Sequence, residues 1–407
     1  MEEFKTYILE ELTIGKGSYG IAAPAIPFNP SKHTYLRITD INDDGTLNKQ
    51  GLMSVDDENA SNYILKENDI VFARTGNSTG RSYFYDGADG KLVYAGFLIK
   101  FSIDKKKVNP RILKYYTHSK PYFNWVRSFD TGGTRGNINA KTYGTMPITL
   151  PSRELQDKIV SILKSLDDKI ELNRRINGNL EQQAQTLFKA WFVENPNPQW
   201  LDGRLSDIAS FVGGYSYKGN ELVDFSNIGM ATIKNYERSG GFKTDGFKDI
   251  NPSPKVKSTQ YAELFDILVA HTDLTQNADV IGNAELLLSF DHYKHIIFSM
   301  DLVKVLPNKN FPYRFLLAAM LKNRIFKSHC LSYVNGTTVL HLSKKALPEY
   351  EITIPTDKEA KRMNDILGCY YKQMAEILRE NDILENLRNT ILPKLMSGKL
   401  KINDLNR

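Results

Sequence analysis

The sequence predicts an α+β protein made of two copies of one module, each a strand-rich globular part followed by a long helix. Two segments, 132–151 and 335–355, carry similar glycine, threonine and proline patterns, and both run directly into a helix-forming stretch. Moving residues 155–192 forward by 204 positions aligns the two helical stretches without a gap, with Leu180 on Leu384. A period this long indicates whole modules rather than the short repeats of a solenoid.

The first globular part is expected at 1–150. Short runs of β-branched and aromatic residues, such as NDIVFARTG and LVYAGFLIKF, are bounded by Gly, Asn and Asp, which is typical of strands. One helical stretch, PRILKYYTHSKPYFNWV, follows them. The second globular part, at 196–354, repeats this order with the strands ELFDILVAHT and HIIFSMDLVKVLP and the helical stretch PYRFLLAAMLKNRIF.

The two helices are expected at 151–195 and 355–407. Ser152 can cap the first, and the prolines of ENPNPQ end it; Pro393 is expected to kink or end the second, with Gly398 as its stop. Roughly forty residues at 1.5 Å each give a rod of about 60 Å. Apolar residues at steps of three and four predict a coiled-coil-like seam. Its predicted members are Ile162, Leu166, Ile170, Leu180 and Leu187 on the first helix, and Ile366, Tyr370, Met374, Leu384 and Ile391 on the second.

Two seamed helices in one chain are expected to bury their seams on each other. For two modules related by an approximate two-fold axis, an antiparallel pair is the natural arrangement. We expect Ile170, Leu180 and Leu187 to pack against Leu384 and Ile391. The pair would carry one globular part at each end and set the distance between them.

Composition and charge are those of an ordinary globular protein. The hydrophobic fraction is 41%, and the net charge of +6 comes from 53 basic and 47 acidic residues. This balance permits nucleic-acid binding without demanding it. The two cysteines form no CxxC motif, which indicates a reducing compartment and no zinc site. No signal peptide and no long apolar run is found, so a cytoplasmic protein without a membrane span is expected.

No complete catalytic motif is found. Residues 15–20, GKGSYG, match GxGxxG, but neither the kinase nor the dinucleotide-binding context follows, and we interpret the segment as a loop whose glycines can approach a phosphate closely. Asn251-Pro252-Ser253-Pro254 is interpreted as a proline turn. A P-loop is absent, and the seven histidines form no HExxH motif. No catalytic residue and no metal ligand is therefore assigned.

Polar, glycine-bearing segments are the candidate binding sites. Arg, Lys, Asn and Thr are residue types that bond base edges and phosphates, although each segment alone also fits an ordinary loop. The candidates in the first module are Arg74, Thr75, Asn77, Arg81, Thr134, Arg135 and Asn137; those in the second are Tyr215, Tyr217, Lys218, Lys234, Asn235, Thr337 and Thr338.

Four segments carry a resemblance to a known family: 68–81, 132–163, its repeat at 335–367, and the ending RNTILPKLMSGKL at 388–400. With them the whole chain resembles the specificity subunit of type I restriction-modification systems. The resemblance implies two target-recognition domains separated by two long helices, which read a bipartite target in double-stranded DNA. It also implies two methylation subunits that use S-adenosylmethionine, and restriction subunits that use ATP and Mg²⁺, with no catalysis and no cofactor in this chain.

Two other interpretations remain open. The chain could belong to a type II-like system with its own nuclease activity, which a cleavage assay with Mg²⁺ would reveal. It could also be a coiled-coil adaptor that binds only proteins, in which case no salt-dependent DNA binding is expected.

Overall fold

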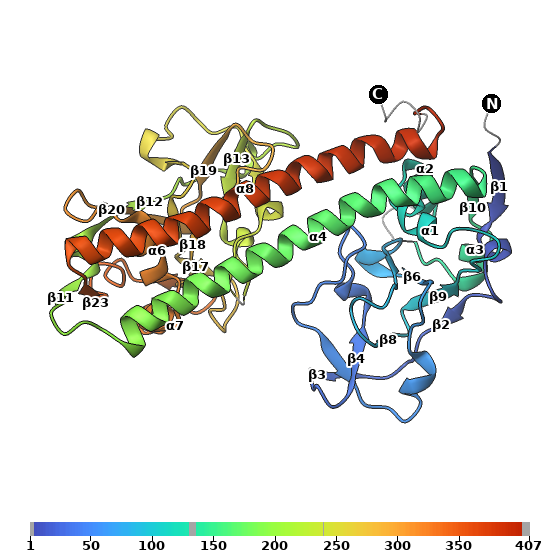
Figure 1. Cartoon of the computed structure of the whole chain (residues 1–407), viewed down its shortest axis with the longest axis horizontal. Helices are drawn as coiled ribbons and strands as arrows, with labels where there is room; N and C mark the ends of the chain where they lie inside the picture. The colour runs from blue at the N-terminus through green and yellow to red at the C-terminus, as the bar shows by residue number, and fades with distance from the viewer. Residues whose placement is uncertain (1–3, 130–135, 239, 401–407) are drawn as a thin grey trace. The chain divides into compact units, whose positions relative to one another are not determined.

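The computed structural model describes residues 4–129, 136–238 and 240–400 of the chain, which mixes helices and strands (Figure 1). Two compact units divide it: the first comprises Met1–Lys169 with Glu385–Arg407, and the second Ile170–Leu384. The long helices α4 (Arg153–Lys189) and α8 (Asp357–Met396) each contribute one end to each unit. Within the described ranges, no helix is long and apolar enough to cross a membrane.

The main sheet of the first unit is antiparallel, with the strand order β2-β9-β6-β7. Its strands are β2 (Ser18–Tyr19), β6 (Asp69–Ala73), β7 (Ser82–Phe84) and β9 (Leu98–Ser102). Side chains alternate across a strand, so β6 buries both of its faces. Ile70 and Phe72 join the larger core with the helices, and Val71 and Ala73 join a second core beneath the other sheet.

A second sheet, a two-stranded ladder and three short helices complete the first unit. The second sheet has the order β3-β5-β4-β8, and β4 and β8 run parallel in it. The ladder pairs β1 with β10, the strand that leads into α4. The bounds are β3 (Ala25–Pro27), β4 (His33–Leu36), β5 (Met53–Val55), β8 (Leu92–Tyr94), β1 (Lys5–Ile8), β10 (Pro147–Leu150), α1 (Arg111–Tyr116), α2 (Lys120–Arg127) and α3 (Ala140–Gly144).

The second unit repeats this construction. Its main sheet has the order β12-β20-β16-β18, its second sheet β14-β13-β19-β15 with β13 and β19 parallel, and β11 pairs with β23 before α8. A small sheet, β17-β22-β21, is added. The bounds are β11 (Leu201–Arg204), α5 (Leu205–Ile208), β12 (Ala209–Gly213), β13 (Ile228–Ala231), β14 (Lys248–Asp249), β15 (Tyr261–Ala262), β16 (Ile267–Ala270), β17 (Thr272–Asp273), β18 (Ala284–Leu286), β19 (His295–Phe298), β20 (Leu302–Pro307), α6 (Arg314–Leu321), α7 (Arg324–Leu331), β21 (Val334–Asn335), β22 (Leu340–Leu342) and β23 (Glu351–Ile354).

The two main sheets also match in their polar contacts. Asp69 begins β6 and Asp266 directly precedes β16, and each carboxylate accepts a hydrogen bond from the backbone N–H three residues earlier. Each also forms an ion pair with a lysine of the neighbouring strand, Asp69 with Lys100 at 3.5 Å and Asp266 with Lys304 at 3.1 Å. The alignment of DIVFA with DILVA is therefore an equivalence of structure as well as of sequence.

The ends of the long helices follow local chemistry. Beyond α4, a five-residue π-helix, Ala190–Glu194, leads to the break at the prolines of ENPNPQ. Pro393 was expected to kink or end the second helix, and the second alternative is wrong, because α8 continues through Pro393 to Met396. A proline this close to a helix end removes only one backbone bond. Gly398, with φ +69°, then ends the helix in the left-handed conformation that glycine adopts readily.

In the second unit, α4 and α8 contact each other and run in opposite directions. The Asn173 amide donates to Asn381 Oδ1 at 2.8 Å, and the Asn177 amide donates to the Met374 carbonyl at 3.3 Å. From Asn173 to Asn177 the residue number rises along α4, while the contacted residue on α8 falls from 381 to 374. The two helices therefore run antiparallel here. Leu180 lies in the same apolar cluster as Met374.

The position of Ile391 corrects part of the predicted pairing. Ile391 packs in the first unit with Ile159 and Leu163, whereas Leu180 and Leu187 belong to the second unit. The expected packing of Leu180 and Leu187 against Ile391 is wrong. Ile391 instead packs against the beginning of α4, within the first unit.

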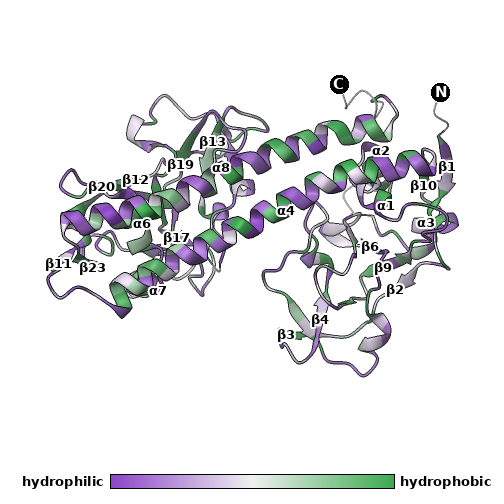
Figure 2. Ribbon diagram, in the orientation of Figure 1, coloured by the Kyte–Doolittle hydropathy of each residue, from purple (hydrophilic) through white to green (hydrophobic). Residues whose placement is uncertain are grey.

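The most buried seam positions lie one residue beyond two of the predicted ones. Leu163 and Leu367 are fully buried, while the predicted Ile162 and Ile366 are half-buried. Along both helices apolar and polar residues alternate, as the change between green and purple shows in Figure 2. A period near 3.6 shifts the buried face gradually, so spacing alone does not decide which of two adjacent apolar residues lies deepest.

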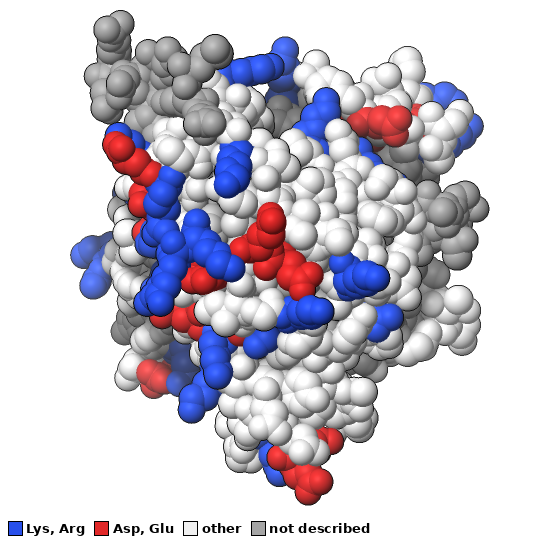
Figure 3. All heavy atoms as spheres, turned by 90° about the vertical axis from the view of Figure 1, so that its right-hand side faces the viewer, with Lys and Arg blue, Asp and Glu red and all other residues white. Residues whose placement is uncertain are grey.

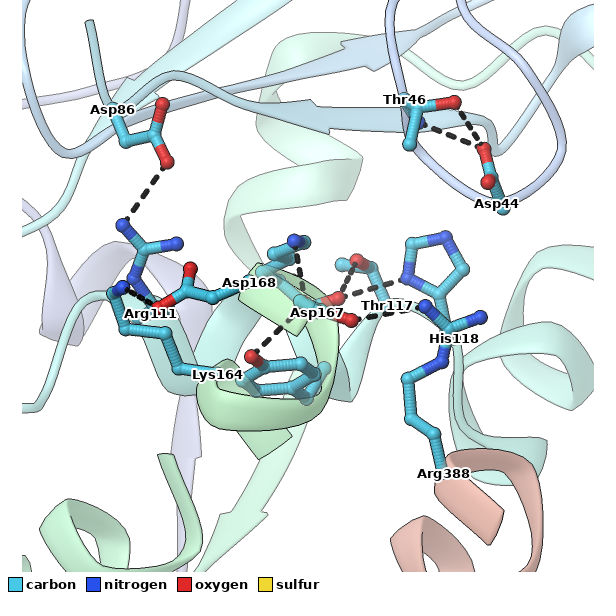
Figure 4. A network of polar contacts seen from close by, with 12 residues as sticks. Asp44, Thr46, Asp86, Arg111, Thr117, His118, Lys164, Asp167, Asp168 and Arg388 are labelled. Carbon is cyan, nitrogen blue, oxygen red and sulfur yellow. Dashed lines mark hydrogen bonds and ion pairs between the residues drawn. The ribbon is translucent and has the colours of Figure 1, made fainter. Parts of the chain in front are cut away.

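A partly buried carboxylate links the helices of the first unit to its globular part (Figure 4). Asp167 of α4 accepts from Lys114 at 2.7 Å, from the Tyr115 hydroxyl at 3.1 Å and from Arg388 of α8 at 2.9 Å. Burial raises the pKa of Asp167, but the two cations outweigh burial and hold it below its usual range. Next to this network, His118 bonds the Lys114 carbonyl through Nδ1 at 2.8 Å, and burial lowers its pKa.

Candidate nucleic-acid interface

In the first unit, two of the polar segments singled out from the sequence lie side by side. The backbone N–H of Ile138 donates to the Arg74 carbonyl at 3.0 Å, and the Thr79 hydroxyl donates to the Gly136 carbonyl at 3.1 Å. Arg74 Nε also donates to Asn137 Oδ1, at 3.4 Å. The segments 74–81 and 136–139 therefore form one surface, although Arg74 and Asn137 are 63 positions apart in the chain.

The glycine-rich segment 15–20 joins the same surface through Tyr19. Its interpretation as a loop is only partly right, because Ser18 and Tyr19 form strand β2. The Arg74 guanidinium lies over the Tyr19 ring, 5.0 Å from its centroid, and the Tyr19 hydroxyl accepts from the backbone N–H of Ala140 at 3.1 Å. A cation held over an aromatic face keeps its planar fork oriented. Phe97, whose carbonyl accepts from the Arg74 N–H, exposes its ring beside it.

The other first-module candidates differ in how far their side chains are free to contact a ligand. Asn77 is exposed, and Thr75 is half-buried. Arg81 is already engaged, since it pairs with Asp43 at 2.7 Å and donates to the Ile41 carbonyl at 3.0 Å. Thr134 and Arg135 lie outside the described residues.

In the second unit, three loops meet in a comparable way. Gln276 donates to the Thr337 carbonyl at 2.8 Å, which joins the segment after β17 to the Gly336-Thr337 segment. A hollow of about 320 Å³ lies between this segment and residues 233–246. Its lining includes Lys234, Arg238, Lys243, Asp245 and Asp273, so three cations surround an open site together with two carboxylates. Thr337, Thr338 and Lys234 are exposed.

Two second-module candidates have structural roles instead. Asn235 is fully buried; it accepts from the Thr232 N–H and donates to the Lys243 carbonyl, so its amide shapes the turn. The buried Tyr215 hydroxyl donates to Glu221 at 2.6 Å.

Tyr217 is half-buried, and Lys248 donates to its hydroxyl at 3.2 Å. Lys218 is exposed, but its backbone N–H donates to Glu221. The 215–218 segment is thus organised around Glu221 and Lys248.

Sequence reasoning missed some residues of these surfaces. Tyr19 was assigned only to a loop, and the clue to its role is the aromatic residue inside a glycine-rich segment. Gln276 and Lys243 gave no signal, because each gains its place through contacts with residues far along the chain.

Charge on the surface is mixed. On the face shown in Figure 3, basic side chains gather along one side with acidic side chains beside them, and uncharged residues cover much of the rest. This face presents no unbroken basic surface. In the described ranges, no three His, Cys, Asp or Glu side chains are grouped so that they could hold a metal ion.

Two units with corresponding orders of strands, each with polar loops next to an antiparallel main sheet, define a protein of the α+β class. Residues 3–182 match the family model of the type I restriction modification DNA specificity domain. This segment of the chain is similar to that domain, and weaker similarity to type I specificity subunits extends over most of the chain.

Individual relatives agree with this assignment. The HindI specificity subunit of Haemophilus influenzae is 31% identical over 49% of this chain, and the match spans 43% of that protein. The MjaIX specificity subunit of Methanocaldococcus jannaschii is 23% identical over 74% of this chain and 72% of its own length. Among solved structures, the type I S subunit from M. genitalium has the same fold, with a TM-score of 0.53, 16% identity and coverage of 97% and 96% of the two chains.

Proposed function

We propose that this chain is the DNA-sequence specificity subunit of a type I restriction-modification complex and reads a bipartite target in double-stranded DNA. One observation carries the proposal: both units join equivalent loops, after β6 in the first and after β16 in the second, to a polar segment that precedes the long helix. Two readers of the same construction with different side chains suit two different half-sites. The matches to type I specificity subunits support the same function.

In this proposal the recognition domains are 1–150 and 196–354, and the helices 151–195 and 355–407 form the antiparallel, coiled-coil-like pair between them. The opposite directions of α4 and α8 within the second unit support the pair. The helix pair would set the number of base pairs between the half-sites.

The proposed DNA contacts are the accessible members of the two surfaces. Arg74 and Asn77 in the first unit have the side chains that pair with guanine and adenine edges. Lys234 and Thr337 in the second unit suit phosphates and base edges. Tyr215 and Asn235 would support their loops rather than touch DNA, because both are buried.

Chemistry would come from partner subunits. Two methylation subunits would use S-adenosylmethionine to modify adenine N6, and restriction subunits would use ATP and Mg²⁺. We place the docking of protein partners on the long helices, where the large apolar side chains of Leu172, Ile383 and Leu387 are exposed.

The deciding experiment maps adenine N6 methylation across the host genome with and without this gene. Loss of one split motif on deletion, and its return on complementation, is the expected result. If the methylation map is unchanged and the purified chain shows no salt-dependent DNA binding, the protein-adaptor interpretation is favoured. Cleavage of DNA by the purified chain with Mg²⁺ would favour the type II-like alternative.

The helix pair can be tested as a ruler. Seven residues inserted after Asn177 and after its counterpart Asn381 keep the heptad seam and lengthen each helix by about 10 Å. At 3.4 Å per base pair, the spacer should grow by about three base pairs while both half-sites stay the same. Changed half-sites with an unchanged spacer would contradict the ruler. Insertion into one helix alone is the control, since it breaks the register and should abolish modification.

A further inference from the structure

Two histidines of the second unit stand where the first unit carries Arg74 and its partner. In the first unit the Arg74 carbonyl accepts from Ile138 at 3.0 Å; in the second, the His271 carbonyl accepts from Leu342 at 2.8 Å. Both residues directly follow the central strand of their main sheet, β6 or β16. His271 is therefore the counterpart of Arg74.

A second backbone bond confirms the equivalence. The Arg74 N–H donates to the Phe97 carbonyl at 3.1 Å, and the His271 N–H donates to the Asp301 carbonyl at 2.8 Å. These acceptors lie at matching places before β9 and β20. Hydrogen bonds of both the backbone carbonyl and the backbone N–H therefore support the equivalence of His271 and Arg74.

The partner position is also a histidine. Asn137 precedes Ile138, and His341 precedes Leu342, so His341 is the counterpart of Asn137. His341 lies opposite Thr272 in the β17–β22 ladder, directly beside His271. The first unit thus carries an Arg–Asn pair where the second carries two imidazoles.

The surroundings of the two histidines are open to a ligand. His341 is exposed and His271 is partly exposed. Leu274, three residues after His271 as Asn77 is after Arg74, leaves 69% of its surface in water. A large apolar side chain at this place suits a thymine methyl group, whereas imidazoles suit base-edge acceptors and phosphates.

We propose that His271 and His341 contact the second half-site of the DNA target, in the role proposed for Arg74 and Asn137 at the first, with Leu274 as an additional apolar contact. This inference rests on the proposed function. It names the residues that make the second reader different from the first.

The charged groups around His271 indicate how the contact depends on pH. Burial lowers the pKa of His271, His341 and Lys344 lower it further, and Asp301 alone acts in the opposite direction. In the free protein the ring is therefore neutral at neutral pH. A nearby phosphate favours the charged form, so binding raises this pKa and takes up a proton. Affinity at the second half-site should increase as the pH falls, whereas Arg74 is always charged and adds no such dependence.

The test compares variants in the native complex by adenine methylation mapping in the host. The double variant His271→Gln/His341→Gln should relax one half of the split motif, and Arg74→Gln the other half. Gln keeps hydrogen-bonding capacity and removes the titration. His292→Gln, at another exposed histidine of the second unit, is the control and should leave the motif unchanged.

A binding measurement adds the second readout. The purified complex is titrated with a duplex that carries the mapped motif, between pH 6 and pH 8. The wild-type protein should bind more tightly at low pH, the double histidine variant should lose about tenfold or more in affinity together with this dependence, and Arg74→Gln should keep the dependence.

The outcomes distinguish a failure of the proposed function from a failure of the inference about the two histidines. If the wild-type host shows no split motif, the proposed function fails and the inference fails with it. If the motif is present but the histidine variants leave it unchanged, or relax both halves equally, only the inference is overturned.

Discussion

Replacing Asp167 by Asn should destabilise the first unit far more than the same change at its neighbour Asp168. Asp167 leaves only 13% of its side chain exposed and forms ion pairs with Lys114 and Arg388. Breaking a fully buried ion pair costs about 3–5 kcal/mol. Because Lys114 and Arg388 keep 25% and 22% exposure, water can solvate them in part, and we expect about 2–3 kcal/mol.

The matched control is Asp168→Asn. Asp168 is 61% exposed and pairs with Lys164 one helical turn away. A surface pair of this kind contributes about 0.3–0.5 kcal/mol. The two variants differ by one position and have the same chemistry, so helix propensity cancels between them.

Hydrogen exchange read by mass spectrometry can localise the effect. Amides of α1 and of the last turns of α8 should exchange about 30- to 150-fold faster in Asp167→Asn, the equivalent of 2–3 kcal/mol. Peptides of the second unit should be unchanged. Equal exchange in the Asp167 and Asp168 variants would refute the reasoning.

The same variant predicts a pH dependence. The folded-state pKa of Asp167 lies below its ordinary value of 3.8. A carboxylate with a depressed pKa stabilises the folded state above the unfolded value, and this contribution is lost as the pH falls through the folded value. The difference between wild type and Asp167→Asn should therefore be full at neutral pH and shrink below about pH 4. A constant difference down to strong acid would contradict this origin.

Three further predictions concern other sites. Lys322→Met should destabilise the second unit by about 3 kcal/mol in chemical denaturation, because it leaves the buried Glu285 and the nearby Glu181 without their cation. Adding Glu285→Gln should recover part of the lost stability. No recovery would argue against an electrostatic cause. Asn177→Leu should raise the thermal stability by about 1 kcal/mol, since Asn177 Oδ1 is buried without a partner in the described structure; a lower melting temperature would show that the amide bond to Met374 matters more. Arg74→Lys should relax one half of the methylated motif, because lysine keeps the charge but loses the planar fork over Tyr19; an unchanged motif would mean that Arg74 supplies charge alone.

The long helices and the duplication were predictable because both depend on local signals. Apolar spacing of three and four residues, a proline break and a final glycine are read within a few turns of chain. The strands DIVFA and DILVA were recognisable for the same reason. Pro393 was misjudged because the cost of a proline depends on how many helical bonds follow it, and here the helix was almost complete.

Within the candidate interface, residue type indicated the segments but not the side chains. Lys234 and Asn235 are neighbours in one polar loop, yet Lys234 is exposed and Asn235 is fully buried. An asparagine satisfies a turn as readily as it reads a base, and only the partners at hand decide which.

By itself the sequence determined that the chain mixes helices and strands, where the long helices lie, and which segments carry polar loops. Only the tertiary structure decided that Arg74 meets Asn137 and Tyr19, that Leu163 rather than Ile162 lies deepest, and that two histidines occupy the matching place in the second unit. The physical reason is the separation along the chain over which each interaction acts. Periodicity and capping act over a few residues, whereas these contacts join residues that become neighbours only when the sheets and helices pack.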